Sequence, residues 1–129
     1  PHSLPREPGT YALALRLDEI HRLVIGALGP WTFPAGCYLY VGSAWGPGGL
    51  EARIARHRKR VGVPARTYRW HIDYLLPFVC LEEVWTFPGR DDECALAEKL
   101  ASLPGAARAV HSFGASDCGC GGHLIWVGA

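Results

Sequence analysis

Residues 37–60, CYLYVGSAWGPGGLEARIARHRKR, pass from a strand-forming run through a glycine-rich loop into a basic amphipathic segment. The first five residues favour a strand, and the glycines and proline of 42–49 interrupt it. Apolar residues then recur at helical spacing, which predicts a helix over 50–60. Arg53 and His57 stand four residues apart, so this helix places both side chains on one face, one turn from each other.

The flanking sequence predicts a small α+β domain that spans residues 1–129. Tyr11 and the three leucines that follow it within 10–17 alternate with other residues, which is strand spacing. The remaining elements are separated by glycine and proline breaks. Strands are predicted at 23–25, 31–33, 78–87, 110–113 and 124–127, and helices at 70–76 and 93–103. We expect a mainly antiparallel central sheet flanked by helices.

The composition is that of a folded protein and excludes disordered and membrane-spanning classes. Of the 129 residues, 49% are hydrophobic and 19% are charged, which is enough apolar material for a core. No apolar run reaches the roughly 18 residues that a membrane helix needs, and no charged-then-apolar leader is present. We therefore expect a cytoplasmic protein with no membrane partner. Because Met is absent, we expect the sequence to be a segment of a longer protein.

Cysteine usage supports the same compartment. The chain has five cysteines, an odd number, and two of them are separated by a single residue, which is poor spacing for a mutual disulfide. Without an export signal, we expect all of them to be reduced thiols. They are Cys37, Cys80, Cys94, Cys118 and Cys120.

Positive charge is concentrated in one block, although the net charge of the chain is only +1. Between residues 51 and 71, seven Arg and Lys residues stand against the single acid Glu51, a local balance of +6. The rest of the chain carries six basic and eleven acidic residues. Arginine forms forked contacts with phosphate. The block is therefore either a solvated helix face or a surface for phosphate or nucleic acid.

Three motifs in a fixed order indicate a family. They are Gly9-x-Tyr11, Tyr40-Val41-Gly42-Ser43-Ala44 and Leu50-x-x-Arg53-x-x-x-His57. Together they resemble the GIY-YIG nuclease superfamily. Three further stretches are similar to a little-characterised branch of that superfamily, found alone or fused to endonuclease III-type proteins: WHIDYLL at 70–76, ECALA at 93–97 and FGASDCGCGGHL at 113–124. The resemblance covers nearly the whole chain.

The resemblance implies hydrolysis of DNA phosphodiester bonds. Tyr11 and Tyr40 would flank the attacking water, and one of them would be the general base. A free phenol titrates near ~10, so we expect neighbouring positive charge to make this tyrosine more acidic. Arg53 would supply that charge and bind the scissile phosphate. His57 would position water or relay a proton near its ordinary pKa. The alternative is that Arg53 and His57 belong only to a solvated basic face.

The resemblance also implies a helical Glu that carries one Mg²⁺ or Mn²⁺ ion. A single carboxylate suffices, because magnesium keeps several waters and takes phosphate oxygens as ligands. Glu93 is followed by the family's apolar spacing, although an acid so early in a helix is also a normal partner of the helix dipole. Glu98 is better centred on the same predicted helix and is the alternative metal ligand.

The sequence departs from the superfamily pattern in three places. Thr10 replaces the middle Ile of the first motif, an exchange that a strand accommodates. Ser43 stands where many relatives carry Lys, which removes one phosphate contact. The two tyrosines are further apart than usual, so we expect an insertion or an extra strand at 23–33. The residues expected to contact DNA are Ser43, Arg56, Arg58, Lys59 and Arg60.

A cluster near the C-terminus is a candidate zinc site. Cys118, Cys120 and His123 are three soft ligands within six residues. A tight turn with buried thiols would give the same pattern, and a nucleophilic thiol beside a histidine is a third interpretation. Candidate fourth ligands are His71, Asp73 and Cys94. For His71 and Asp73 we favour structural hydrogen bonds within a core helix.

These observations predict a metal-dependent DNA endonuclease. The alternative is a non-catalytic nucleic-acid-binding module, stabilised by zinc through the C-terminal cluster. Branched, flapped or damaged DNA are candidate substrates, and phosphate contacts alone do not distinguish RNA from DNA. A fused or associated DNA-repair protein is the expected partner. Binding should weaken steeply with added salt if several phosphates are neutralised.

Overall fold

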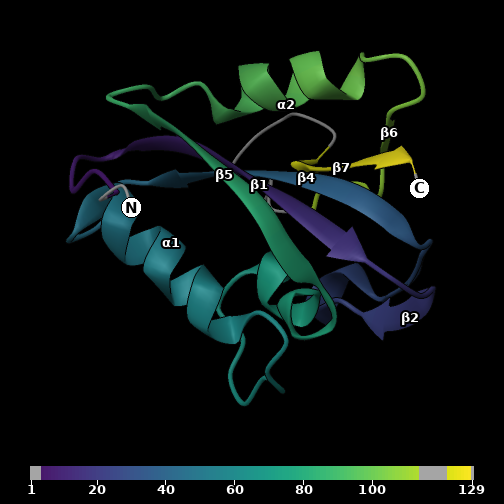
Figure 1. The fold of residues 1–129 in the computed structure, drawn as a ribbon. Coiled ribbons are helices and arrows are strands. Elements are labelled where there is room, and N and C mark those ends of the chain that lie inside the picture. The colour runs from purple at the N-terminus through teal and green to yellow at the C-terminus, as the bar shows by residue number, and fades with distance from the viewer. Residues whose placement is uncertain (1–3, 114–121, 129) are drawn as a thin grey trace.

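A five-stranded antiparallel sheet with one helix on each face forms the centre of the fold (Figure 1). The computed structural model describes residues 4–113 and 122–128. Spatially, the strands follow the order β5-β1-β4-β7-β6. Their bounds are β1 Gly9–Leu17, β4 Gly36–Ala44, β5 Cys80–Pro88, β6 Ala107–Arg108 and β7 Leu124–Gly128. The predicted α+β class with an antiparallel sheet is confirmed.

Alternation along the two central strands divides the core between the two faces of the sheet. Leu13 of β1 and Tyr38 of β4 are fully buried in the larger cluster, together with Leu50 and Ile54 of helix α1 (Gly49–Arg60). The opposite face is covered by helix α2 (Glu93–Ala101). Residues with the other parity, such as Val41, pack there with Ala97. Each face of the sheet is therefore specified by period-two patterning in the sequence.

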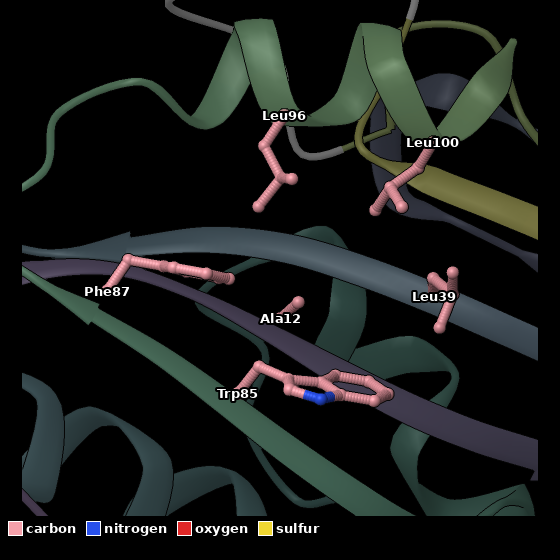
Figure 2. Close-up of a pocket in the computed structure, with 6 residues that line it drawn as sticks. All are labelled: Ala12, Leu39, Trp85, Phe87, Leu96 and Leu100. Atoms are coloured by element: carbon pink, nitrogen blue, oxygen red, sulfur yellow. The ribbon is translucent and has the colours of Figure 1, made fainter.

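The face of the sheet beneath α2 contains an apolar hollow. A hollow of about 290 Å³ lies between α2 and the sheet, and Figure 2 shows the apolar side chains that line it. They are Ala12, Leu39, Trp85, Phe87, Leu96 and Leu100. Trp85 retains 42% of its surface exposed, so this side of the sheet is open at the β5 edge.

The segment between the two tyrosine-bearing strands is a separate hairpin. Strands β2 (His21–Val24) and β3 (Pro30–Phe33) pair antiparallel, joined through the short 3₁₀ turn η1 (Gly26–Leu28). This confirms the extra structure expected at 23–33. No helix in 4–113 or 122–128 combines the length and apolarity needed to cross a membrane.

Two sequence-based assignments of secondary structure are wrong. Residues 110–113 form a turn instead of a strand, with Ser112 at a positive φ of 66° and the Phe113 N–H bonded to the Val110 carbonyl. Residues 70–76 do not form one α-helix. They divide between two 3₁₀ turns, η2 (His71–Tyr74) and η3 (Leu76–Phe78), because Pro77 lacks an N–H and cannot continue an α-helical ladder.

Candidate functional site

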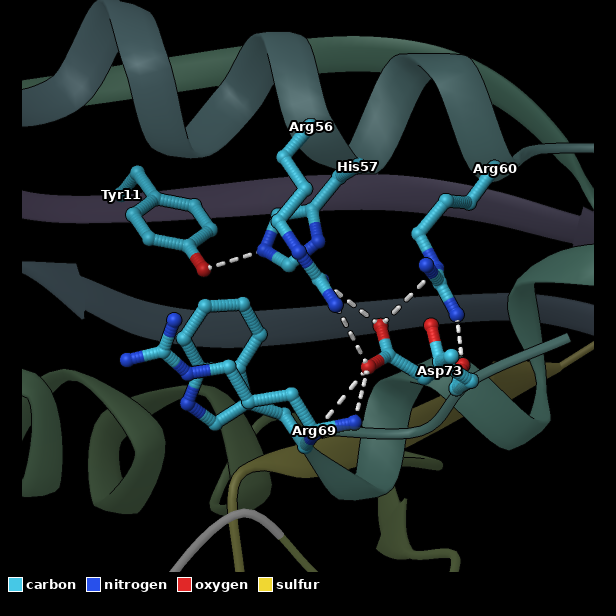
Figure 3. Close-up of polar contacts among 8 residues, drawn as sticks. Tyr11, Arg56, His57, Arg60, Arg69 and Asp73 are labelled. Atoms are coloured by element: carbon cyan, nitrogen blue, oxygen red, sulfur yellow. Dashed lines mark hydrogen bonds and ion pairs between the residues drawn. The ribbon is translucent and has the colours of Figure 1, made fainter. Parts of the chain in front are cut away.

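Tyr11 of β1 and His57 of α1 form a buried hydrogen-bonded pair at the centre of the site (Figure 3). The Tyr11 Oη and the His57 Nε2 are 2.7 Å apart. Tyr40, on the neighbouring strand β4, lies beside both, with its ring centroid 6.3 Å from that of Tyr11 and 6.2 Å from that of His57. The structure therefore brings together the two tyrosines and the histidine that the sequence motifs single out.

The register between β1 and β4 explains why a glycine follows Tyr40 and Val41. Tyr11 is paired with Gly42 across the two strands. A Cβ atom at residue 42 would lie 2.5 Å from the Tyr11 Oη, a distance that real Cβ atoms do not show. The missing side chain therefore lets the Tyr11 phenol pass close to the backbone of β4 and reach His57.

Arg53 lies one helical turn before His57 and connects α1 with the end of β4. Its Nη1 donates to the Ser43 carbonyl at 2.6 Å, and its Cζ lies 4.2 Å from the centre of the Trp70 ring. Neither of these two contacts is with a carboxylate, so neither neutralises the positive charge of the guanidinium. Arg53 can therefore offer N–H donors to an anionic ligand.

Neither tyrosine has the lowered pKa that the sequence interpretation requires. Burial raises the pKa of Tyr11 well above its ordinary value, and the charge and hydrogen bonding of Arg53 lower it without compensating. Burial likewise raises the pKa of Tyr40, with a further rise from Glu93. The expectation of a tyrosine made more acidic is therefore wrong for the free protein, because desolvation of the phenolate outweighs one neighbouring cation.

His57 also departs from its expected protonation behaviour. Burial lowers its pKa to about 3, helped by the charges of Arg56 and Arg53 and opposed by Asp73. The imidazole is therefore neutral at neutral pH, instead of titrating near its ordinary value. Its Nδ1 atom is buried and has no hydrogen-bond partner among the described residues.

Asp73 is a fully buried carboxylate that organises the basic side of the site, which consists of Arg56, Arg60 and Arg69 (Figure 3). Arg56 donates to it from both terminal nitrogens, at 2.9 and 3.0 Å. The backbone N–H groups of Arg69 and Trp70 donate to Oδ2 at 2.7 and 3.0 Å, and the Nε of Arg60 lies 3.5 Å from Oδ1. Burial raises the pKa of Asp73, but these hydrogen bonds outweigh it and hold the pKa below its ordinary value.

This arrangement separates the residues that were expected to contact DNA. Arg56 and Arg60 face the buried Asp73, and the Arg60 Nη2 also donates to the Thr67 carbonyl. Arg58 and Lys59 are exposed on α1. The structural role favoured for Asp73 is confirmed, and the last two residues are the better candidates for solvent-side phosphate contacts.

The two candidate metal ligands occupy different environments. Glu93, the first residue of α2, is close enough to raise the pKa values of both Tyr11 and Tyr40. Glu98 lies one turn further along and pairs with Arg108 at 2.6 Å. Glu93 therefore shares the electrostatic environment of the tyrosines, and its partly exposed carboxylate offers the hard oxygen ligand that Mg²⁺ or Mn²⁺ prefers.

The cysteine and histidine cluster is described only in part. Cys118 and Cys120 lie outside the described residues. The Sγ of Cys94 lies 3.5 Å from the His123 Nε2, so one of the candidate fourth ligands does approach His123. Cys94 is disulfide-bonded, which corrects the expectation that all five cysteines are reduced and removes Cys94 as a fourth zinc ligand. Cys37 and Cys80 are free thiols.

Comparison with known proteins gives the chain a family. A family model described as "Domain of unknown function DUF123" matches residues 10–129. The chain belongs to this family. A search of curated proteins and a search of solved structures each returned no match. The match of this DUF123 domain includes all the site residues from Tyr11 to His123, so the site lies within the matched segment.

The DUF123 domain also contains a positioning contact that the sequence did not reveal. The Thr10 hydroxyl donates to the Arg90 carbonyl at 2.9 Å and accepts from the Asp92 N–H at 3.4 Å. Asp92 immediately precedes Glu93, so Thr10 ties the first residues of α2 to the strand that carries Tyr11. The sequence indicates only that Thr10 is compatible with a strand, and the one signal of a positioning contact is a polar side chain within an otherwise apolar strand.

Residues 4–113 and 122–128 contain no group of three or more His, Cys, Asp or Glu side chains that could hold a metal ion. A site built on one carboxylate, in which water and phosphate complete the coordination, does not require such a group.

Proposed function

We propose that this domain is a metal-dependent DNA endonuclease that hydrolyses phosphodiester bonds at the Tyr11–His57 pair. The observation that carries the proposal is the 2.7 Å contact between these two buried side chains, with Arg53 one helical turn from His57. A hydroxyl, a neutral imidazole and a guanidinium that meet at one place suit acid–base chemistry on a phosphate.

The raised pKa of Tyr11 makes a proton relay a better mechanism than a preformed phenolate. The oxygen of an attacking water bonds to phosphorus while its proton passes to the Tyr11 Oη. The Tyr11 proton passes at the same time to the His57 Nε2, which is neutral and able to accept it. The bond from phosphorus to the leaving oxygen breaks, and that oxygen takes a proton from solvent.

Substrate binding would improve His57 as a proton acceptor. Burial and the positive charges of Arg56 and Arg53 lower the pKa of His57 to about 3 in the free protein. A bound phosphate would bring negative charge beside the same cations and weaken their effect on the imidazole. Arg53 would contact the phosphate, because its guanidinium can offer two N–H donors in a fork.

Glu93 is the residue that would hold the metal ion. When bound, one Mg²⁺ or Mn²⁺ would neutralise charge that develops on the phosphate oxygens. Glu93 is preferred over Glu98 for this role because its charge raises the pKa values of both tyrosines, which places it in their electrostatic environment. The exposed Arg58 and Lys59 would hold the DNA backbone outside the reaction centre.

A nicking assay tests the proposal. Supercoiled plasmid and branched or flapped oligonucleotides are incubated with Mg²⁺, Mn²⁺ or EDTA. We expect metal-dependent cutting, and a loss of about 10²- to 10³-fold in Arg53→Ala, as when a transition-state donor is removed. Glu93→Gln should lose activity comparably, and the matched variant Glu98→Gln should retain it. Absence of cutting on every substrate while binding persists would contradict the proposal.

A non-catalytic nucleic-acid-binding module is the second candidate. It is favoured by the protonation states of the site, since both tyrosines are weak acids and His57 is a weak base in the free protein. A zinc-stabilised version of this module would depend on Cys118, Cys120 and His123, because the disulfide-bonded Cys94 has no thiolate to offer a metal ion. Native mass spectrometry distinguishes a zinc-stabilised module from a zinc-free one. A stoichiometric zinc adduct would support the zinc-stabilised module, and the mass of the metal-free protein would exclude it.

A further inference from the structure

The loop after α1 forms two adjoining hollows of different chemistry. One, of about 350 Å³, is lined by apolar and aromatic residues that include Tyr68, Tyr74 and Phe78. The other, of about 380 Å³, is lined in part by Lys59, Arg60 and Arg66. Both volumes lie within the range of small-molecule sites, roughly 300–1,000 Å³. Pro64 and Ala65 line both hollows, so they share a wall.

An aromatic ring is held in a fixed orientation in the first hollow. Tyr68 and Tyr74 stack face to face, with ring centroids 4.1 Å apart and planes 10° from parallel. Tyr68 nevertheless remains 51% exposed and Phe78 43% exposed. A half-exposed aromatic residue that is already oriented by a stacked neighbour can receive a planar ligand with little loss of side-chain entropy.

The second hollow supplies charge for an anion. Lys59 and Arg66 are exposed, and no carboxylate lines either hollow. A planar group in the aromatic hollow could therefore be covalently joined to an anionic group in the basic one. A nucleotide has this combination, with a base that stacks on aromatic rings and a phosphate that binds Lys and Arg.

The two hollows are connected to the candidate reaction centre through residues 68–74. Trp70, two residues after Tyr68, lies 6.0 Å from the His57 ring, centroid to centroid, and beneath the Arg53 guanidinium. Asp73 fixes this connection, because it binds the backbone of Trp70 and the side chain of Arg56. A nucleic-acid strand that extends from the candidate reaction centre towards the C-terminal end of α1 would meet the loop that follows α1 (Figure 1).

We propose that the two hollows form a subsite for one unpaired nucleotide of the nucleic-acid substrate, with the base stacked at Tyr68 and the phosphate on Lys59 and Arg66. This inference rests on the proposed function for the identity of the ligand. A base in a duplex is stacked between its neighbours and cannot enter an aromatic hollow. The subsite therefore selects substrates with a single-stranded stretch, such as a flap, over continuous duplex.

The test measures binding with catalysis prevented by EDTA. The probes are a fluorescein-labelled oligothymidylate, a duplex of the same length, and an oligonucleotide with 2-aminopurine at successive positions. We expect tighter binding to the single strand and quenching of 2-aminopurine at one preferred position. Tyr68→Ala should weaken single-strand binding about tenfold and abolish the quenching, whereas Tyr68→Phe retains both because the ring remains. Trp85→Ala, at an exposed aromatic residue on the α2 side of the sheet, is the matched control and should change neither.

Each outcome separates the subsite from the proposed nuclease. Equal affinity for duplex and single strand, or unchanged quenching in Tyr68→Ala, would overturn the subsite even if the protein nicks plasmid. Selective, Tyr68-dependent binding without cutting on any substrate would retain the subsite and contradict the nuclease. Circular dichroism and thermal unfolding of each variant identify any loss of fold. A free mononucleotide that competes fully with the oligonucleotide would show that the hollows bind nucleotides and not a strand, which also contradicts the substrate assignment.

Discussion

Replacing Asp73 with Asn changes a fully buried carboxylate that accepts two hydrogen bonds from Arg56 and two from backbone N–H groups. The amide retains one acceptor oxygen, but its NH₂ group must face a donor, and the Arg56 charge loses its partner. Removal of one member of a buried ion pair typically costs about 3–5 kcal/mol. Because the Asn oxygen keeps some of these hydrogen bonds, we expect Asp73→Asn to lower the free energy of unfolding by about 3 kcal/mol.

Urea denaturation followed by circular dichroism at neutral pH measures this change. For a chain of this length, a loss of that size corresponds to a fall in the melting temperature of about 12 °C, at roughly 4 °C per kcal/mol. Asp18→Asn is the matched control, because Asp18 is an exposed aspartate immediately after β1. Its stability should be within about 0.5 kcal/mol of that of the parent protein.

A double-mutant cycle with Arg56→Met isolates the ion pair from the backbone hydrogen bonds. Once Arg56 is gone, Asp73→Asn should be less damaging by at least about 1 kcal/mol, because the orphaned guanidinium no longer contributes to the loss. A loss below about 1 kcal/mol for Asp73→Asn alone, or strict additivity in the cycle, would refute the role of Asp73 as the organiser of the basic side of the site.

Two further predictions concern protonation and the placement of α2. The pKa of His57 falls from its ordinary value near 6.5 to about 3 on folding. Between these pH values the unfolded chain therefore binds a proton that the folded chain does not. The free energy of unfolding should decrease by up to about 4–5 kcal/mol as the pH falls from 7 to 3. His57→Gln should flatten this dependence in denaturation curves recorded across that range; an unchanged slope would contradict a buried neutral imidazole. Thr10→Val keeps the shape of the side chain but removes its hydrogen bonds, and should cost about 1 kcal/mol and speed amide exchange at Asp92. The control Thr86→Val in β5 should leave amide exchange at Asp92 as it is in the parent protein. If Thr10→Val also leaves this exchange unchanged, Thr10 does not hold the start of α2.

The elements of the site followed from local sequence patterns. Alternation placed Tyr11 on a buried strand face, the glycine-rich loop ended β4, and the spacing of Arg53 and His57 put both on one side of α1. Each of these features depends on residues within a few positions of one another, where strand and helix periods leave few choices.

Local patterns failed where a distant residue or an unusual backbone conformation decides the outcome. The apolar residues at 110–113 resemble a strand, but Ser112 adopts a left-handed conformation and the chain turns. The basic residues at 51–60 resemble a uniform phosphate-binding face, yet Arg56 is directed to Asp73, seventeen positions away. Cys94 looked like one of five free thiols and is disulfide-bonded.

The sequence by itself determined the α+β class, the two faces of the sheet and the set of residue types that meet at the site, because these follow from short-range periodicity. Only the tertiary structure decided their protonation, since a pKa depends on burial and on the summed field of groups brought together by folding. Burial keeps Tyr11 and Tyr40 as neutral phenols and His57 as a neutral imidazole. Folding likewise brought the charge of Glu93 within reach of both tyrosines and paired Glu98 with Arg108 of β6.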